Sequence, residues 1–466
     1  MLYTVGIAFS RVTNFLLLPL YLASLATEEY GALGLVESVV RILVLVAMMG
    51  TPQAVIKLGV DLADDPEKRR RLAATSMSWA GLAGIGLGGL MAIAWPYLTP
   101  YIGGVPLWPV AAAGLCGVAG AAMFQVAVAD IQGRRKSTQH TVYSAAQSCL
   151  LILFVVPLLT ILKLGPSAIL LATAISFAVA TVLVAMKTKH RLSPTLDRPL
   201  LRQALQFGIP LLPYYLAAVV LQTTDRFMLA SFATDGLTAV GVYAFGAKLG
   251  SALTMVGVGF QRAWLPFFME EQSRGAGKDW RRVRAFSLRS IIVLGALACV
   301  MALTAPELTR VLAPEEYAGG AVVAGVIAFA AVLSAWSQMC VSVLMGEQRT
   351  SRMIWWFTVP VAILNIGLNL WLVPIHGALG AAWATVAAMA VNALLTSFAA
   401  VKLKGVPLNV VLAGVVAVVC FGVVWFGASL GVFSRYGLAL AVVVGVAVVA
   451  LRMRAQKDNA GDSKIG

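Results

Sequence analysis

The sequence predicts an all-α integral membrane protein of about 14 transmembrane helices. The 466 residues are 60% hydrophobic and only 12% charged, with a mean hydropathy of +0.87, which is far too apolar for a soluble domain. Apolar runs near the length of a bilayer-spanning helix recur along the chain. One stretch also returns 207 residues later, which indicates an internal duplication and predicts two six-helix repeats followed by two extra helices.

Hydropathy predicts fourteen spans. An odd number of spans would disrupt the alternation of basic and cation-poor loops along the chain, so the number is expected to be even. Two of them are long enough to tilt or to protrude from the bilayer. In chain order the predicted spans are 2–25, 31–56, 73–95, 106–130, 140–162, 166–186, 207–232, 238–262, 286–305, 321–345, 353–374, 377–400, 407–428 and 436–451.

The repeated stretch is Leu22–Arg41, and it returns without gaps as Leu229–Lys248, with seven identical residues. Each copy ends one span, turns through a short acidic loop and enters a second span that carries one cation. That cation is Arg41 in the first copy and Lys248 in the second. Chance similarity between apolar segments is the alternative explanation. Because six spans precede the second copy, both halves share one orientation, and the repeat axis is expected along the membrane normal.

The basic residues alternate from loop to loop. Of the 35 Lys and Arg, 27 lie in one set of loops, whereas only Lys163, Arg310 and Arg435 lie in the alternate set. The positive-inside rule assigns the rich set to the cytoplasm, so both termini are expected to be cytoplasmic. The formal charge of +15 therefore reflects membrane orientation and does not indicate a nucleic-acid partner.

These spans divide the chain into five expected parts. Residues 1–186 form an N-terminal lobe and residues 207–400 form a C-terminal lobe, each with six spans. Residues 187–206 form a cytoplasmic linker, and its LDRPLLRQALQF segment has leucines on one side and arginines on the other, which is typical of an interfacial helix. Residues 401–452 hold spans thirteen and fourteen, and the polar residues 453–466 are expected to form a disordered cytoplasmic tail.

Four segments resemble one family of transporters: LLLPLYLASLATEEYGALGL at Leu16–Leu35, TTDRFMLA at Thr223–Ala230, QRAWLPFF at Gln261–Phe268 and NIGLNLWLVPIHGALGAAWAT at Asn365–Thr385. The chain resembles the polysaccharide-transporter branch of the multidrug/oligosaccharidyl-lipid/polysaccharide (MOP) flippase superfamily, the Wzx-like O-antigen and capsule flippases. Each segment is short and apolar, so the order and spacing of the four carry the resemblance from span one to span twelve.

The resemblance implies a fold and an activity that composition does not give. It implies two six-helix lobes that face each other in a V around a central cavity. It also implies that rocking of the lobes moves a lipid-linked oligosaccharide from the inner to the outer leaflet of the bacterial cytoplasmic membrane.

Polar and ionisable side chains inside the spans are the candidates for substrate binding, because a charge within the bilayer is costly and normally faces protein or water. A pyrophosphate that joins lipid to sugar carries two or more negative charges, and the planar guanidinium of arginine binds phosphate oxygens in a bidentate manner. Cations from spans one, two, seven and eight are therefore expected to bracket a cleft between the repeats. The predicted set is Arg11, Asn14, Arg41, Gln222, Arg226 and Lys248.

Structural roles explain some of these residues equally well. Glu37 precedes Arg41 by four residues in the favourable order for a helical ion pair, which would neutralise Arg41 in place. Asp225 and Arg226 are adjacent and point about 100° apart around a helix, so they could clamp the lobe interface instead. Asn14 could equally form a hydrogen bond between helices.

Energy coupling needs a group that changes charge or binds an ion. Glu37 and Asp225 are the acids at depth, so they are the candidates for coupling to H⁺ or Na⁺. No other cofactor and no metal are expected, because the five cysteines lie singly in apolar runs and the three histidines lie far apart.

The leading hypothesis is a flippase for a polyprenyl-pyrophosphate-linked oligosaccharide that works by alternating access in the export of a cell-surface polysaccharide such as O-antigen. Its expected partners are this cargo, membrane lipids and other polysaccharide assembly proteins. A multidrug or organic-cation antiporter of the same superfamily is an alternative that would favour an acid-rich cleft. A flippase of the lipid-linked peptidoglycan precursor is another, which the sequence hardly separates from the first.

An enzyme is not expected. A membrane glycosyltransferase or polymerase needs acidic residues in a sizeable loop outside the membrane, to hold a metal or to act as a base. The predicted loops are short, and the longest of them are basic.

Overall fold

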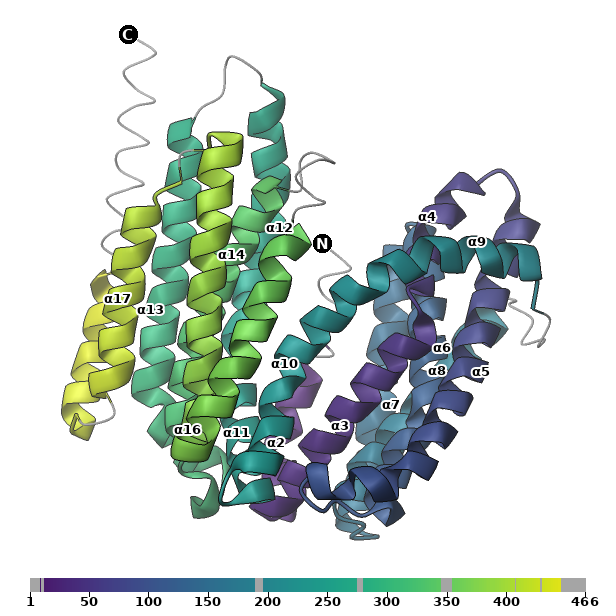
Figure 1. Cartoon of the computed structure of the whole chain (residues 1–466), viewed down its shortest axis with the longest axis horizontal. Coiled ribbons are helices and arrows are strands. Elements are labelled where there is room, and N and C mark those ends of the chain that lie inside the picture. The colour runs from purple at the N-terminus through teal and green to yellow at the C-terminus, as the bar shows by residue number, and fades with distance from the viewer. Residues whose placement is uncertain are drawn as a thin grey trace. The chain divides into compact units, whose positions relative to one another are not determined.

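The computed structural model describes residues 9, 12–188, 196–274, 280–344, 354–406, 408–427 and 430–445. Within these ranges the regular structure is entirely helical (Figure 1). The principal helices are α2 (Leu18–Ser24), α3 (Thr27–Met48), α4 (Thr51–Asp61), α5 (Pro66–Leu98), α6 (Ala112–Gly133), α7 (Ser137–Thr160), α8 (Pro166–Thr188), α9 (Arg198–Gly208), α10 (Leu212–Phe232), α11 (Gly236–Gly250), α12 (Ala252–Ser273), α13 (Trp280–Leu312), α14 (Gly320–Leu344), α16 (Ile354–Lys404) and α17 (Val410–Gly427); short turns are η1 (Thr99–Tyr101), η2 (Leu107–Ala111), η3 (Ile209–Leu211) and η5 (Glu315–Tyr317).

Helical segments occupy all fourteen predicted spans in the described part of the chain. Ten helical runs there are long and apolar enough to cross a membrane, and one of them, Thr358–Lys402, covers two predicted spans. The helix α10 and the shorter apolar helices Val12–Ser24 and Val432–Gly445 account for the remaining three. The prediction of an all-α, multi-span membrane protein is confirmed.

The helix α16 is two spans joined by a turn. Its 51 residues would extend about 76 Å as a straight helix, far beyond the roughly 30 Å of bilayer hydrocarbon. Gly377 interrupts it with φ 52° and ψ −132°, a conformation that side-chain-bearing residues rarely adopt. A Cβ on Gly380 would strike the Leu372 carbonyl, although eight residues of straight helix rise by about 12 Å. The chain therefore reverses at Gly377, where the two spans were predicted to meet.

Two of the predicted long spans each consist of two helices. The predicted span 31–56 covers α3 and the start of α4, because Met49 and Gly50 adopt left-handed conformations with φ 46° and 74°. The predicted span 238–262 covers α11 and the first half of α12, which are separated at Ser251. Hydropathy is continuous across both breaks, so it could not indicate either one.

The chain divides into two compact units, Met1–Gly241 and Val242–Gly466. This division falls inside α11, so α10 belongs to the first unit, where it packs on α3. The lobe boundaries inferred from the repeat, with the linker 187–206 between them, remain a prediction. The predicted tail, 453–466, lies outside the described residues.

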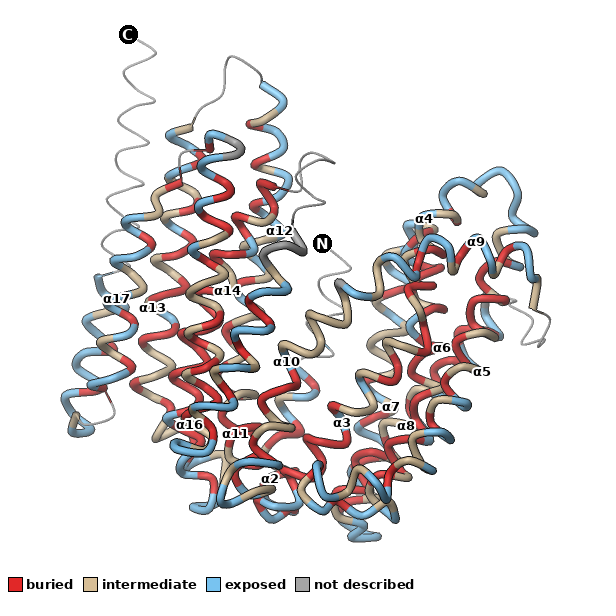
Figure 2. The backbone as a smooth tube through the Cα atoms, viewed as in Figure 1, coloured by how far each residue is buried: buried red, intermediate tan, exposed pale blue. Residues whose placement is uncertain are grey.

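The helix α6 forms the centre of the first unit and packs against α3, α4, α5 and α8. Small residues let it approach its neighbours closely: a Cβ on Gly84 of α5 would lie only 2.7 Å from the Ala119 Cα, and one on Gly117 would lie 3.1 Å from the Ala174 Cβ. Such contacts are the usual means by which helices associate in a bilayer. Figure 2 shows the resulting concentration of buried residues along α6.

The helix α9 lies against the junction of α3 and α4. Its first turn is capped by the carboxylate of Asp197, which accepts a hydrogen bond from the Leu200 amide at 3.2 Å. Leu200 is buried while Arg202 is exposed, as the amphipathic pattern predicts. At the other end of α9, Gly208 packs directly on Gly50, and a Cβ on either residue would strike the backbone of the other.

The helix α14 forms the centre of the second unit and packs against α12, α13, α16 and α17. Hydrogen bonds between side chains join it to the second half of α16. Trp336 Nε1 donates to Ser397 Oγ at 2.8 Å, and Asn392 Nδ2 donates to Ser337 Oγ at 2.9 Å. These polar residues therefore join helices within the unit.

A candidate site on α3 and α10

Arg226 joins α10 to α3. Its Nη1 donates to Ser38 Oγ at 2.9 Å and to the Gly34 carbonyl at 3.2 Å. Ser38 is fully buried and donates in turn to the same Gly34 carbonyl at 2.7 Å. The Arg226 Nε is buried and has no hydrogen-bond partner in the described structure. This guanidinium is therefore fixed in place with part of its donor capacity unused.

Arg41 lies close to this junction on the same helix as Ser38. The charges that act on it are those of Arg226, which repels it, and of Glu37, which attracts it. Glu37 and Arg41 are both exposed, so the Arg41 guanidinium remains open to a ligand. The three side chains give the site a formal charge of +1, which favours an anion.

The structure thus brings together Glu37, Arg41 and Arg226 from the predicted set. Gln222 lies one turn before Arg226 on α10 and is exposed. Asp225 is adjacent in sequence but buried, with 3% of its surface exposed.

The structure does not place three further predicted residues in this group. Asn14 is exposed and precedes α2. Lys248 is half-buried on α11 and belongs to the second unit. Arg11 lies outside the described residues. The proposal that cations from both repeats bracket one cleft remains a prediction.

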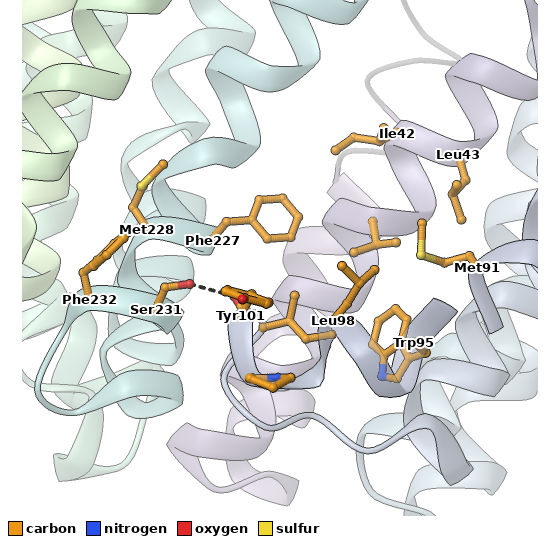
Figure 3. A pocket seen from close by; sticks show the side chains of 13 residues that line it. Ile42, Leu43, Met91, Trp95, Leu98, Tyr101, Phe227, Met228, Ser231 and Phe232 are labelled. Carbon is orange, nitrogen blue, oxygen red and sulfur yellow. Dashed lines mark hydrogen bonds between the residues drawn. The ribbon is translucent and has the colours of Figure 1, made fainter. Parts of the chain in front are cut away.

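An open cavity of about 710 Å³ lies within the first unit (Figure 3). It is lined by α3, the end of α5 with η1, and the end of α10. Val39, Ile42 and Leu43 form the α3 wall, while Phe227 and Met228 belong to the α10 wall. Sequence reasoning missed this cavity, because apolar residues at such helical spacing occur on any membrane helix and give no signal of a void.

Two polar side chains of the cavity wall donate to backbone carbonyls. Ser231 Oγ donates to the Tyr101 carbonyl at 2.7 Å, which Figure 3 marks with a dashed line. Trp95 Nε1 donates to the Val105 carbonyl at 2.9 Å. Both donors are therefore engaged within the protein, and most of the remaining wall is apolar.

Two other charged clusters lie at helix ends that carry the basic loops. In the first unit, Asp130 of α6 is fully buried between Arg134, at 2.8 Å, and Arg69 of α5, at 3.7 Å. In the second unit, Glu271 of α12 pairs with Arg282 of α13 at 2.9 Å. Each cluster joins neighbouring helices. Among the described residues, no three His, Cys, Asp or Glu side chains come together as metal ligands do.

Comparison with known proteins shows the family to which the sequence is related. The family model described as "Polysaccharide biosynthesis protein" matches residues 1–272. No curated protein matches the sequence.

Solved structures share the fold over most of the chain. Lipid II flippase MurJ in an inward closed conformation aligns with a TM-score of 0.75 at 10% identity, covering 97% of this chain and 99% of that one. An inward-facing multidrug resistance MATE family transporter of the MOP superfamily aligns with a TM-score of 0.66 at 16% identity, covering 86% and 99%. A MOP superfamily transporter from Pyrococcus furiosus, described as having a binding pocket of reverse polarity, aligns with a TM-score of 0.56 at 16% identity, covering 86% and 94%. At these identities the likeness concerns the fold.

Proposed function

The chain belongs to the polysaccharide biosynthesis protein family, and from this premise we propose that it flips a polyprenyl-pyrophosphate-linked oligosaccharide across the bacterial cytoplasmic membrane. The cargo moves from the inner to the outer leaflet by alternating access, for export of a cell-surface polysaccharide such as O-antigen. The membership and the transporter fold support a flippase; the choice of cargo rests on the site chemistry.

The observation that carries the proposal is the pair of arginines, Arg41 and Arg226, on membrane-spanning helices. Charges at such depth are expensive unless they serve a ligand or a partner. Nη1 of Arg226 is engaged in hydrogen bonds that join α10 to α3, whereas the Arg41 side chain is exposed on the surface of α3. Two guanidinium groups match the charge and the oxygen geometry of a diphosphate.

In this proposal each residue has a distinct role. Arg41 binds the pyrophosphate oxygens, and Arg226, held by Ser38, adds the positive charge of its guanidinium. Glu37 reduces the net positive charge, which weakens binding enough for release. Arg11 and Lys248 add positive charge from their own spans, while Asn14 and Gln222 form hydrogen bonds with the sugar nearest the pyrophosphate.

Glu37 and Asp225 are the groups through which H⁺ or Na⁺ would be coupled to transport. Protonation of Glu37 would raise the charge of the arginine site and tighten its hold on an anion. Both termini are cytoplasmic in this proposal, where the basic loops would also meet other polysaccharide assembly proteins.

The test is flipping of a fluorescent polyprenyl-pyrophosphate oligosaccharide in proteoliposomes. Arg41→Ala combined with Lys248→Ala should lower the rate at least tenfold with folding intact. The matched control is Arg70→Ala, which removes an exposed cation from the first turns of α5 and should flip at the wild-type rate. Unchanged flipping by the double variant would refute the arginine–lysine site.

The lipid-linked peptidoglycan precursor is the second candidate cargo, because the fold is shared with a lipid II flippase. The same assay with that lipid in place of the oligosaccharide carrier separates the two cargoes. Efflux of small organic cations, without flipping of either lipid, would instead indicate a multidrug antiporter.

A further inference from the structure

The segment Thr99–Val105 follows α5, includes η1 and is bonded at both ends to Trp95, whose side chain is 1% exposed. The Thr99 hydroxyl donates to the Trp95 carbonyl at 2.9 Å, and Trp95 Nε1 donates to the Val105 carbonyl at 2.9 Å. The Gly104 amide donates to the Thr99 carbonyl, also at 2.9 Å, which closes the segment into a compact loop. The base of this loop is therefore fixed to α5.

The tip of the loop reaches α10. The Ser231 hydroxyl on α10 donates to the Tyr101 carbonyl at 2.7 Å (Figure 3). Ser231 is exposed and Tyr101 is 69% exposed, so water can reach this bond and replace either partner at little net cost. The bond from Trp95 at the base is buried and has no such competitor. The tip is therefore the part of the loop that is easier to detach.

Two glycines beside the tip give the loop a hinge. Gly103 and Gly104 have φ angles of 67° and 76°, a region that residues with a Cβ rarely adopt. Gly103 also lets the loop lie close to the turn after α10, because a Cβ there would be 2.8 Å from Leu237 Cδ2. A Cβ on Gly104 would meet nothing within 4 Å, so the backbone has room to rotate on that side. Loop positions of this kind commonly serve as the hinges of lids.

The loop also forms part of the cavity wall. Pro100, Tyr101 and Ile102 line the cavity together with the end of α5 and the end of α10. We propose that Thr99–Val105 is a hinged lid on the cavity of the first unit, held to α10 by the bond between Ser231 and Tyr101. When that bond breaks, the tip swings away from α10 and the opening of the cavity widens.

The lid lies on the outer side of the membrane in the predicted topology. It belongs to the loop between the predicted spans 73–95 and 106–130, which contains no Lys or Arg. The lid would therefore control entry to the cavity from that side. It goes beyond the proposed function, because it concerns access to the cavity and is the same whichever cargo crosses the membrane.

The test measures how fast a cysteine in the cavity reacts with N-ethylmaleimide. The purified full-length chain is used in lipid nanodiscs, with Cys116 and Cys149 replaced by serine because they are the exposed cysteines. The reporter is Leu43→Cys, since Leu43 lines the cavity and is only 6% exposed. Ser231→Ala, which removes the bond that holds the tip, should raise the labelling rate at least threefold.

Two controls separate opening of the lid from general loosening. Leu151→Cys on α7 is a reporter of equal exposure, 6%, outside the cavity, and Ser231→Ala should leave its labelling rate unchanged. Thr160→Ala removes another exposed hydroxyl, which donates to the Val156 carbonyl within α7 at 2.8 Å. It should leave the labelling rate of Leu43→Cys unchanged.

A disulfide that fixes the lid should have the opposite effect. A Cβ on Gly103 would lie 3.5 Å from the Ala230 Cβ, within the range found in disulfides, so Gly103→Cys with Ala230→Cys should cross-link the loop to α10. The matched pair, Gly120→Cys with Ala178→Cys, has a Cβ separation of 3.7 Å and joins α6 to α8. The first cross-link should slow labelling of Leu43→Cys at least threefold, as measured by mass spectrometry of its peptide, and the second should not.

Equal labelling of Leu43→Cys with and without Ser231→Ala overturns the lid. Faster labelling of Leu151→Cys overturns it too, because the substitution would then loosen the whole unit. So does a labelling rate that the cross-link from loop to α10 leaves unchanged. If the positive φ of Gly103 prevents the cysteine variant from folding, the comparison with Ser231→Ala decides alone. Flipping of the lipid-linked oligosaccharide enters none of these measurements, so the proposed function is judged separately.

Discussion

Arg226 makes both of its hydrogen bonds to α3 from one nitrogen, Nη1, at the far end of its side chain. Lysine at this position keeps the charge, but its side chain is one bond shorter, so its ammonium nitrogen does not reach the place of Nη1. We expect Arg226→Lys to lower the free energy of unfolding by about 1 kcal/mol, the usual net worth of such hydrogen bonds. Thermal unfolding in detergent measures this.

The control for Arg226 is a double-mutant cycle with Ser38→Ala. If the Arg226–Ser38 bond is responsible, the effects of Arg226→Lys and Ser38→Ala should be non-additive, because the second change removes an interaction already lost. Strictly additive losses would show that the two side chains stabilise the protein independently.

Asp130 is the buried counter-ion of two arginines in the first unit. It is fully buried, and Asp130→Asn would leave Arg69 and Arg134 without their counter-ion. Breaking a buried pair typically costs about 3–5 kcal/mol, and because these arginines are partly exposed we expect about 2 kcal/mol here. Asp61→Asn, whose partner Lys57 is exposed, should cost less than about 1 kcal/mol. Equal losses in the two variants, measured by chemical unfolding, would contradict the assigned role of Asp130.

The polar residues inside spans were the part of the site that sequence could predict. Charged residues are rare within apolar runs, so their presence indicates a functional or structural role, and Glu37, Arg41 and Arg226 meet this criterion. The hydrogen bond from Arg226 to Ser38 was not predictable, because the two residues lie 188 positions apart and serine gives no hydropathy signal. The cavity was not predictable either, since a void depends on the packing of several helices.

At the scale of helices, hydropathy predicted the spans well because the bilayer allows the backbone few alternatives. Every peptide group in the hydrocarbon must be hydrogen-bonded within its own helix, so an apolar run of sufficient length becomes a helix almost regardless of its sequence. Interruptions such as Met49–Gly50 arise from local backbone conformations, to which hydropathy is insensitive.

The turn at Gly377 gives a prediction at this scale. Its φ of 52° with ψ of −132° is strained for any residue with a Cβ, so Gly377→Ala should destabilise the second unit by about 1–3 kcal/mol. Gly367 lies in the same helix, where an added Cβ would meet nothing within 4 Å, and Gly367→Ala should be neutral or slightly stabilising. Thermal shifts of equal size for the two variants would exclude a special role for Gly377.

At the scale of the whole molecule, the alternation of cations predicts the topology. A reporter that is active only in the cytoplasm, fused after Arg454, should be active, because the basic loops are expected there. The same reporter inserted beside Lys163 should be inactive, since that loop belongs to the cation-poor set. The opposite pair of results would invert the topology and, with it, the assigned direction of transport.

The membership of α10 in the first unit has a consequence for how such a chain arose and how it can be divided. The 207-residue repeat assigns α10 to the second half, yet it packs on α3 and is bonded to it by Arg226. In a half-length ancestor with one copy of the repeat, the face of α3 that α10 now covers would have been exposed. The first helix of a second copy would have packed on that face, as in a domain-swapped homodimer. Gene fusion would then have made the exchange intramolecular. Two fragments encoded separately, with the break between α8 and α9, should accordingly reassemble in the membrane through α10, whereas neither fragment should be stable without the other.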